Sequence, residues 1–266
     1  MDKIIKDIEV NKENVSIWIC PDWKSEAFQK YLLSIPLNEV EGTRVDEKNK
    51  RNKLLKIEKN LDLGIKKDIL IKEFKLKRVY DKIRFKFLKS KAFRSLEIAL
   101  KLESIEVKTP KAIAVIEKRD RNKNIVFSYY ISEYVDCKYN LLEITRDPKH
   151  KYRRYVKDYL PQIGKDLRKM HENGLVHNDF HPGNILIKNI DTMPEFYYID
   201  LNRGRIKNKV NTRNRITDVI KINIYEEEEE IFIKNYCPED WENWLLKLRI
   251  NRANRKKIRK IRKIFK

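Results

Sequence analysis

The residues best suited to chemistry lie in one short segment of the second half of the chain, HENGLVHNDFHPGNILI. Asp179 stands two residues after His177 and five before Asn184, between a helical pattern and an apolar run. A second apolar run, FYYI, ends in Asp200. Phosphoryl transfer requires a carboxylate beside the acceptor hydroxyl and oxygen ligands for a metal that neutralises the phosphates. We therefore expect Asp179 to act on the acceptor, and Asn184 and Asp200 to bind Mg²⁺.

The spacing H-x-D-x-x-x-x-N is that of kinase-like phosphotransferases. Asp179 and Asn184 could instead be ordinary turn formers, but the later Asp200 in the expected place argues against this. We interpret His177 as a residue that holds the loop by hydrogen bonds. Asn178 stands where many regulated protein kinases carry arginine, so control by a phosphorylated activation loop is not indicated.

A kinase also needs a strand lysine that binds the nucleotide phosphates and a helix glutamate that pairs with it. Lys72 projects from the apolar strand pattern ILIKEF, and Glu97 interrupts the apolar stripe of a predicted helix, where a carboxylate needs a cationic partner. We expect Lys72 and Glu97 to pair and to bind ATP. The alternatives are that both are solvated, or that Lys75 and Glu103 take these roles. The first half contains no G-x-G-x-x-G phosphate loop.

The elements that must position these residues follow from the hydrophobic periodicity. The pattern predicts an α+β, bilobed, protein-kinase-like fold with a small strand-rich N-lobe over residues 1–132 and a larger helical C-lobe over 133–266. Strands are expected at 16–20, 54–57, 68–74, 112–117, 125–132, 185–187 and 196–199. Helices are expected at 24–33, 80–104, 151–173, 215–225, 226–235 and from 238 to the end.

Composition limits the environment and the partners. The chain has 266 residues, a formal net charge of +21 and three widely spaced cysteines, which favour a reducing compartment over a disulfide framework or zinc site. No apolar run approaches the roughly 18 residues of a membrane span. We expect a cytoplasmic protein, soluble or peripheral on the inner face of the cytoplasmic membrane.

Basic residues gather in two places. Residues 247–266 carry 11 Lys or Arg and no acid, with apolar residues at helical spacing at 246, 250, 258, 261 and 265. This seam suits an anionic membrane surface, or it packs on the second lobe; both alternatives stay open. Six Lys or Arg between 203 and 215 follow Asp200 and indicate an anionic acceptor. The glutamates at 226–230 are expected to form a solvated helix start.

The sequence resembles the lipopolysaccharide core kinases (Kdo kinase and heptose kinase) of the protein-kinase-like superfamily. The resemblance rests on VHNDFHPGNILI, YYIDLNRGRI, ILIKEF and KAFRSLEIALKL followed by VKTPKAIAV, and it runs from about residue 68 to 215. It implies transfer of the ATP γ-phosphate to a sugar hydroxyl of the lipopolysaccharide inner core. Asp179 would be the catalytic base, with Asn184 and Asp200 as Mg²⁺ ligands and Lys72 and Glu97 as the phosphate-binding pair.

Other functions share parts of this pattern. HNDFHPGNIL is equally similar to aminoglycoside and choline phosphotransferases, and IDLNRGR favours the lipopolysaccharide kinases. A small atypical protein kinase would share the loop residues. An inactive kinase-like module that binds anions or nucleic acid is disfavoured because Asp179, Asn184 and Asp200 are all retained. The expected partner is an anionic glycolipid or sugar, and nucleic acid is not expected.

Overall fold

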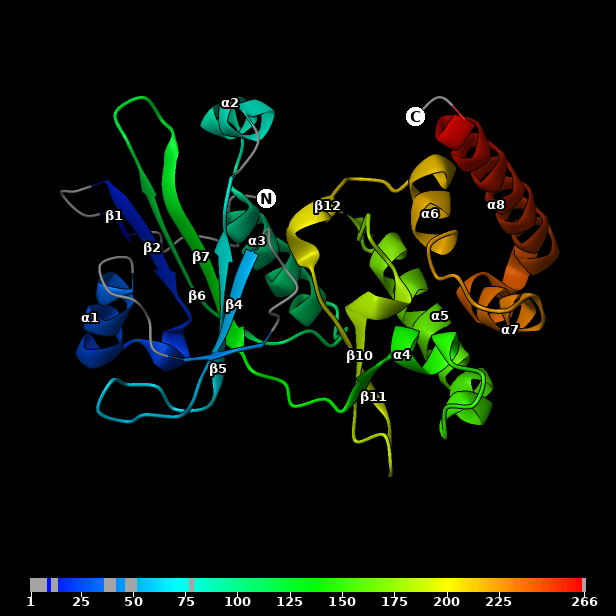
Figure 1. Ribbon diagram of the computed structural model, residues 1–266, viewed down its shortest axis with the longest axis horizontal. Coiled ribbons are helices and arrows are strands. Elements are labelled where there is room, and N and C mark those ends of the chain that lie inside the picture. The colour runs from blue at the N-terminus through cyan, green and yellow to red at the C-terminus, as the bar shows by residue number, and fades with distance from the viewer. Residues whose placement is uncertain (1–8, 11–13, 36–41, 46–51, 77–78, 265–266) are drawn as a thin grey trace. The chain divides into compact units, whose positions relative to one another are not determined.

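The computed structural model describes residues 9–10, 14–35, 42–45, 52–76 and 79–264. The chain divides into two compact units (Figure 1). The N-terminal unit comprises Met1–Glu103 and Pro110–Asp136, and the C-terminal unit comprises Ser104–Thr109 and Cys137–Lys266.

A seven-stranded antiparallel sheet forms the centre of the N-terminal unit, in the order β1-β2-β6-β7-β5-β4-β3. Six consecutive residues of β6, from Ala112 to Glu117, are buried, as expected for a central strand covered on both faces. The predicted strands of this half are confirmed. The bounds are β1 Glu9–Val10, β2 Val15–Ile19, β3 Thr43–Arg44, β4 Asn52–Ile57, β5 Ile69–Phe74, β6 Ala112–Arg119 and β7 Ile125–Glu133.

The helices of this unit are α1 Glu26–Ser34, α2 Val79–Phe87 and α3 Lys91–Ser104, with a 3-10 turn at Pro21–Trp23. The prediction of one long helix over 80–104 was wrong, because the chain leaves the helix after Phe87. Ser90 begins the second helix, since its Oγ accepts the Phe93 N–H at 3.2 Å. Apolar spacing continues across the break, so periodicity alone does not reveal it.

The C-terminal unit has short strands and mostly helices. A three-stranded sheet has the order β11-β10-β8, and β9 pairs with β12. The strands are β8 Tyr139–Asn140, β9 Leu175–Val176, β10 Ile185–Lys188, β11 Glu195–Tyr198 and β12 Arg205–Ile206. The helices are α4 Leu141–Arg146, α5 Val156–Glu172, α6 Thr212–Val219, α7 Glu226–Tyr236 and α8 Trp241–Ile264, with 3-10 turns at Arg153–Tyr155, Pro182–Asn184, Leu201–Arg203 and Pro238–Asp240.

Two helix boundaries reflect local geometry. Gly174 ends α5 as predicted, with φ of 78°, and a Cβ there would meet the Lys207 carbonyl oxygen at 2.2 Å. The helix predicted over 215–225 corresponds to α6, which begins and ends earlier than predicted. Asn211 caps α6 by accepting the Asn214 N–H at 2.9 Å, and the chain is no longer helical at Asn223, where φ is positive.

The acidic start of α7 agrees only in part with the predicted solvated helix start, since the glutamates at 226, 227 and 230 are exposed. Glu228 and Glu229 are buried. Glu228 pairs with Arg153, and Glu229 pairs with Arg252 and, at 3.3 Å, with Arg249. Buried carboxylates are tolerated when they are paired in this way. These pairs tie α7 to α8 and to the segment before α5.

Candidate active site

The loop between β9 and the 3-10 turn at Pro182–Asn184 carries Asp179. Its backbone carbonyl accepts the His181 N–H at 2.7 Å and the Asn184 Nδ2–H at 2.9 Å. The loop turns at Asn178, which has φ of 62°, a region that asparagine tolerates better than most residues. The Asp179–Asn184 spacing therefore closes a compact loop in which both predicted residues come together.

His177 holds this loop from within. Its ring is buried; Nε2 donates to the Ile199 carbonyl at 3.2 Å, and Nδ1 accepts the Asp179 N–H at 3.3 Å. Burial lowers the pKa of the imidazole, although the Asp218 carboxylate opposes this effect. A second proton on Nδ1 would face the Asp179 N–H, so the neutral ring is the form that supports the loop.

Asp200 follows directly after Ile199, which bonds to both ends of the loop. The Ile199 N–H donates to the Asn184 carbonyl at 3.0 Å, which links the two chain segments one residue before Asp200. Asp200 has φ of 60°, and Asn202 Nδ2 donates to its Oδ1. The Asn184 side-chain nitrogen donates to the Asp179 carbonyl, so the side-chain oxygen of Asn184 points away from that carbonyl. One carboxylate and one amide oxygen fit Mg²⁺, which takes few protein ligands beside substrate phosphates.

Among the described residues, no cluster of three or more His, Cys, Asp or Glu side chains is placed to hold a metal. The candidate pair of Asn184 and Asp200 contains only one such side chain, as expected for a site completed by nucleotide phosphates.

Sequence reasoning missed Asp218, a buried residue of α6. Its Oδ2 accepts the His177 N–H at 2.8 Å and contacts His171 Nε2 at 3.3 Å. It thereby fixes the start of the loop to α6. A signal was present, because Asp218 begins the stretch DVIKINI, in which charged residues interrupt an apolar run.

Two cations flank the Asp179 carboxylate. Lys221 Nζ lies 3.4 Å from Oδ1 and also donates to the Asn178 carbonyl, and Arg203 Nη1 lies 3.3 Å from Oδ2. Arg203 was among the basic residues predicted to face the acceptor, whereas Lys221 was missed. Asp218 and Lys221 are three residues apart, and together they hold the segment from His177 to Asp179 at both ends.

The positive surroundings extend to His181 and α8. Burial lowers the pKa of the His181 ring, and the Lys221 and Arg255 cations act in the same direction against the opposing Asp179 carboxylate. A basic residue of α8 therefore contributes to the field at the loop. An anionic group would be attracted here.

We expect Lys221→Met to lower kcat by about tenfold or more while leaving the nucleotide KM unchanged, because Lys221 positions Asp179. Steady-state kinetics with varied nucleotide and acceptor check this. Lys221→Arg should restore part of the rate, and Lys165→Met, which removes an exposed lysine of α5 in the same unit, is the matched control. An unchanged kcat for Lys221→Met, with an unchanged melting temperature, would remove Lys221 from the mechanism.

The predicted nucleotide-binding pair lies in the N-terminal unit. Lys72 is on β5, opposite Tyr130 of β7, and its Nζ lies 5.2 Å from the centroid of the Phe74 ring. Glu97 is on α3, and its carboxylate contacts Lys89 Nζ. The cationic partner predicted for Glu97 was Lys72, whereas the contact described for its carboxylate is with Lys89. The assignment of Lys72 and Glu97 to nucleotide phosphates remains a prediction.

The fold and the loop geometry define a phosphotransferase of the protein-kinase-like class. The family model described as "Lipopolysaccharide kinase (Kdo/WaaP) family" matches residues 37–245, more than half of the chain. The chain therefore belongs to this family. Membership makes it an enzyme that phosphorylates a sugar hydroxyl of the lipopolysaccharide core and implies use of ATP. The family, the fold class and the class of reaction predicted from the sequence are confirmed.

A solved structure, "WaaP in complex with acyl carrier protein", is similar in fold. The TM-score is 0.55 at 15% sequence identity, and the match covers 87% of this chain and 98% of that chain. At this identity the likeness concerns the fold alone. No curated protein matches the sequence.

Proposed function

We propose that this kinase transfers the γ-phosphate of Mg²⁺-bound ATP to a hydroxyl of an anionic inner-core sugar, with Kdo as the first candidate. The observation that carries the proposal is the pair of cations, Lys221 and Arg203, on either side of the Asp179 carboxylate. Kdo carries a carboxylate on the sugar itself, and a guanidinium binds a carboxylate with good geometry. A heptose bearing phosphate is the second candidate.

In this function Asp179 orients the acceptor hydroxyl and accepts its proton. His177 and Asp218 hold the loop, and Lys221 holds the Asp179 carboxylate at the acceptor. When bound, Mg²⁺ would neutralise charge on the phosphates, with Asn184 and Asp200 as its protein ligands. Lys72, oriented by Glu97, would bind the phosphates from the N-terminal unit.

A direct test offers labelled ATP with a panel of acceptors: Kdo linked to lipid A, a heptose-containing core, an aminoglycoside and a generic protein. We expect label in the Kdo acceptor, and we expect Arg203→Gln to raise the KM for it by about tenfold. Label only in the heptose core would replace Kdo by the second candidate. Label only in protein or aminoglycoside would contradict the proposed function.

We also propose that α8 contributes to peripheral attachment at the inner face of the cytoplasmic membrane. Its buried face carries Trp244, Leu245 and Leu248. Of the seam residues, Leu246, Ile250 and Ile258 are each about half exposed. The helix therefore packs on its unit and still presents an apolar and basic face, which supports membrane contact. Phe265 of the predicted seam lies outside the described residues.

Among the described residues, no helix is both long and apolar enough to cross a membrane.

A further inference from the structure

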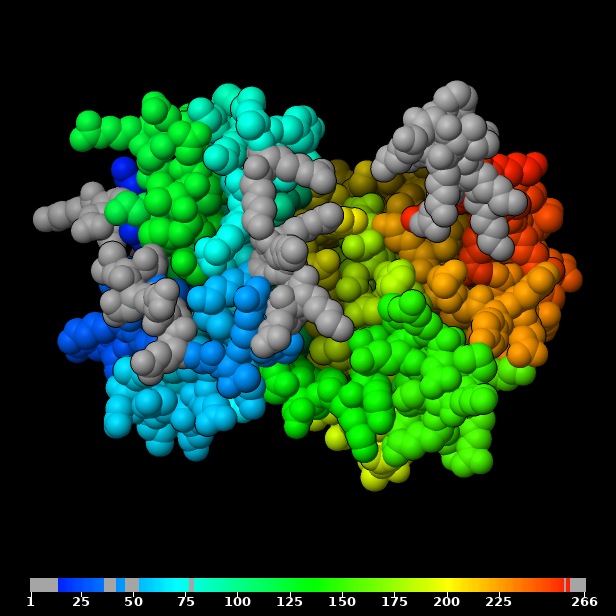
Figure 2. Space-filling view, viewed as in Figure 1, coloured from blue at the N-terminus to red at the C-terminus, as the bar shows by residue number. Residues whose placement is uncertain are grey.

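Helix α2 presents large apolar side chains to solvent. Val79, Tyr80, Ile83 and Phe87 are 71%, 70%, 57% and 80% exposed. We call these four residues the α2 stripe. The helix lies at the surface of the molecule, coloured cyan (Figure 2). Contiguous exposed apolar residues of this size are costly in water and mark interaction sites.

The residues around the stripe are basic. At about 100° per residue, the α2 stripe spans about 100° of the helix circumference. Lys82 and Lys86 border it on one side, and Arg84 borders it on the other. Lys89 follows the helix and is exposed. Phe85 points the opposite way and is buried. An apolar face with cations at both edges is the arrangement of helices that lie in a membrane interface.

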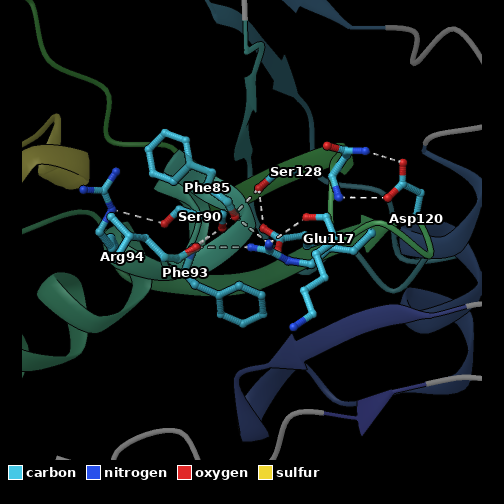
Figure 3. A network of polar contacts seen from close by, with 11 residues as sticks. Phe85, Ser90, Phe93, Arg94, Glu117, Asp120 and Ser128 are labelled. Atoms are coloured by element: carbon cyan, nitrogen blue, oxygen red, sulfur yellow. Dashed lines mark hydrogen bonds and ion pairs between the residues drawn. The ribbon is translucent and has the colours of Figure 1, made fainter. Parts of the chain in front are cut away.

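The exposure of the stripe does not come from loose attachment of the helix. Phe85 anchors α2 in the core, and Arg119 of β6 donates from Nη1 to the Phe85 carbonyl at 2.6 Å and from Nη2 to the Leu88 carbonyl at 3.4 Å. Arg119 is itself fixed by Glu117, at 2.8 Å, which is buried and accepts the Ser128 hydroxyl at 3.0 Å (Figure 3). A side chain of the sheet thus holds the backbone of the last turn of α2.

We infer that the α2 stripe and its basic borders form a membrane-binding surface of the N-terminal unit, which inserts its apolar side chains at an anionic lipid interface. Charge complementarity selects this occupant, since cations at both edges of an apolar stripe meet lipid headgroups while the stripe meets acyl chains. The inference rests on the proposed function only in that the acceptor is carried by lipid. It adds a second contact, separate from α8.

The test uses the full-length protein and vesicles of phosphatidylglycerol mixed with phosphatidylcholine, compared with phosphatidylcholine alone. We expect Ile83→Ser combined with Phe87→Ser to lower the partition coefficient by about tenfold at both low and high salt. We expect Lys82→Gln combined with Lys86→Gln to lower it by about tenfold at low salt and much less at high salt. Phe87→Trp should add fluorescence that brominated lipid quenches.

The matched control is Leu61→Ser combined with Met193→Ser, because these residues are similarly exposed, at 66% and 77%, and lie outside the stripe. It should bind vesicles like the wild type. Equal binding by the Ile83 and Phe87 variant, or fluorescence from Phe87→Trp that brominated lipid leaves unquenched, would overturn the inference. A change of oligomeric mass in light scattering, without a change in vesicle binding, would assign the stripe to a second copy of the chain and also overturn it.

These readouts contain no catalytic step. Failure of the α2 inference therefore leaves transfer to a delipidated acceptor intact, whereas failure of the proposed function appears in the acceptor panel with vesicle binding unchanged.

Discussion

Asp179→Ala is expected to lower kcat by about 10² to 10⁴-fold, the usual contribution of a positioned general base. The fold and the affinity for nucleotide should change little, because this carboxylate acts on the acceptor. Asp179→Asn should be nearly as inactive, since it keeps the shape of the side chain and removes its basicity. Single-turnover phosphoryl transfer, nucleotide titration calorimetry and a melting curve measure the three quantities.

Asp158→Ala is a suitable control, because it removes an exposed carboxylate from α5 in the same unit. It should keep the wild-type rate. Near-full turnover in Asp179→Asn would exclude Asp179 as the base. A large loss of nucleotide affinity in the same variant would instead place its role on the donor side.

Asp200→Asn is expected to weaken magnesium-dependent nucleotide binding by about tenfold to a hundredfold, because it deletes the only carboxylate of the candidate metal pair. Asparagine is chosen because the position has φ of 60°, where alanine would add strain unrelated to the metal. Calorimetry with ATP should show the loss in the presence of Mg²⁺ and little change in its absence.

The contrast between the two metal conditions is the control within this experiment. Equal losses with and without Mg²⁺ would mean that the substitution disturbs the loop. Unchanged Mg²⁺-ATP affinity would assign the metal to other residues. With either outcome the result for Asp179→Ala stays interpretable, because the effect on the acceptor is measured in a separate experiment.

Local patterns in the sequence predicted much of the fold. The strands around ILIKEF and AIAVIE follow from runs of β-branched residues, and the end of α5 follows from Gly174. The break between α2 and α3 escaped prediction because both helices keep the same apolar spacing across it. The two helices have similar apolar patterns in the sequence. Only the tertiary structure shows that the apolar stripe of α3 is buried and that of α2 is exposed.

Charged residues show the same limit. The run of glutamates at the start of α7 reads as a solvated helix end, but Glu228 and Glu229 are buried by arginines that come from 75 residues earlier and from α8. Packing between distant segments determines which residues form such pairs. A local pattern carries no information about them, because a paired buried carboxylate and a solvated one occupy the same kind of sequence.

For the candidate active site, the local sequence was enough to predict which residues react, because Asp179 and Asn184 lie within one loop whose length is fixed by their spacing, and Asp200 follows the next hairpin. The family resemblance rested on the same local segments. The tertiary structure alone decided what supports them: Asp218 and Lys221 reach the loop from more than 40 residues away. Hydrogen bonds within a loop depend on covalent spacing, whereas those between segments exist only after α6 has packed beside it.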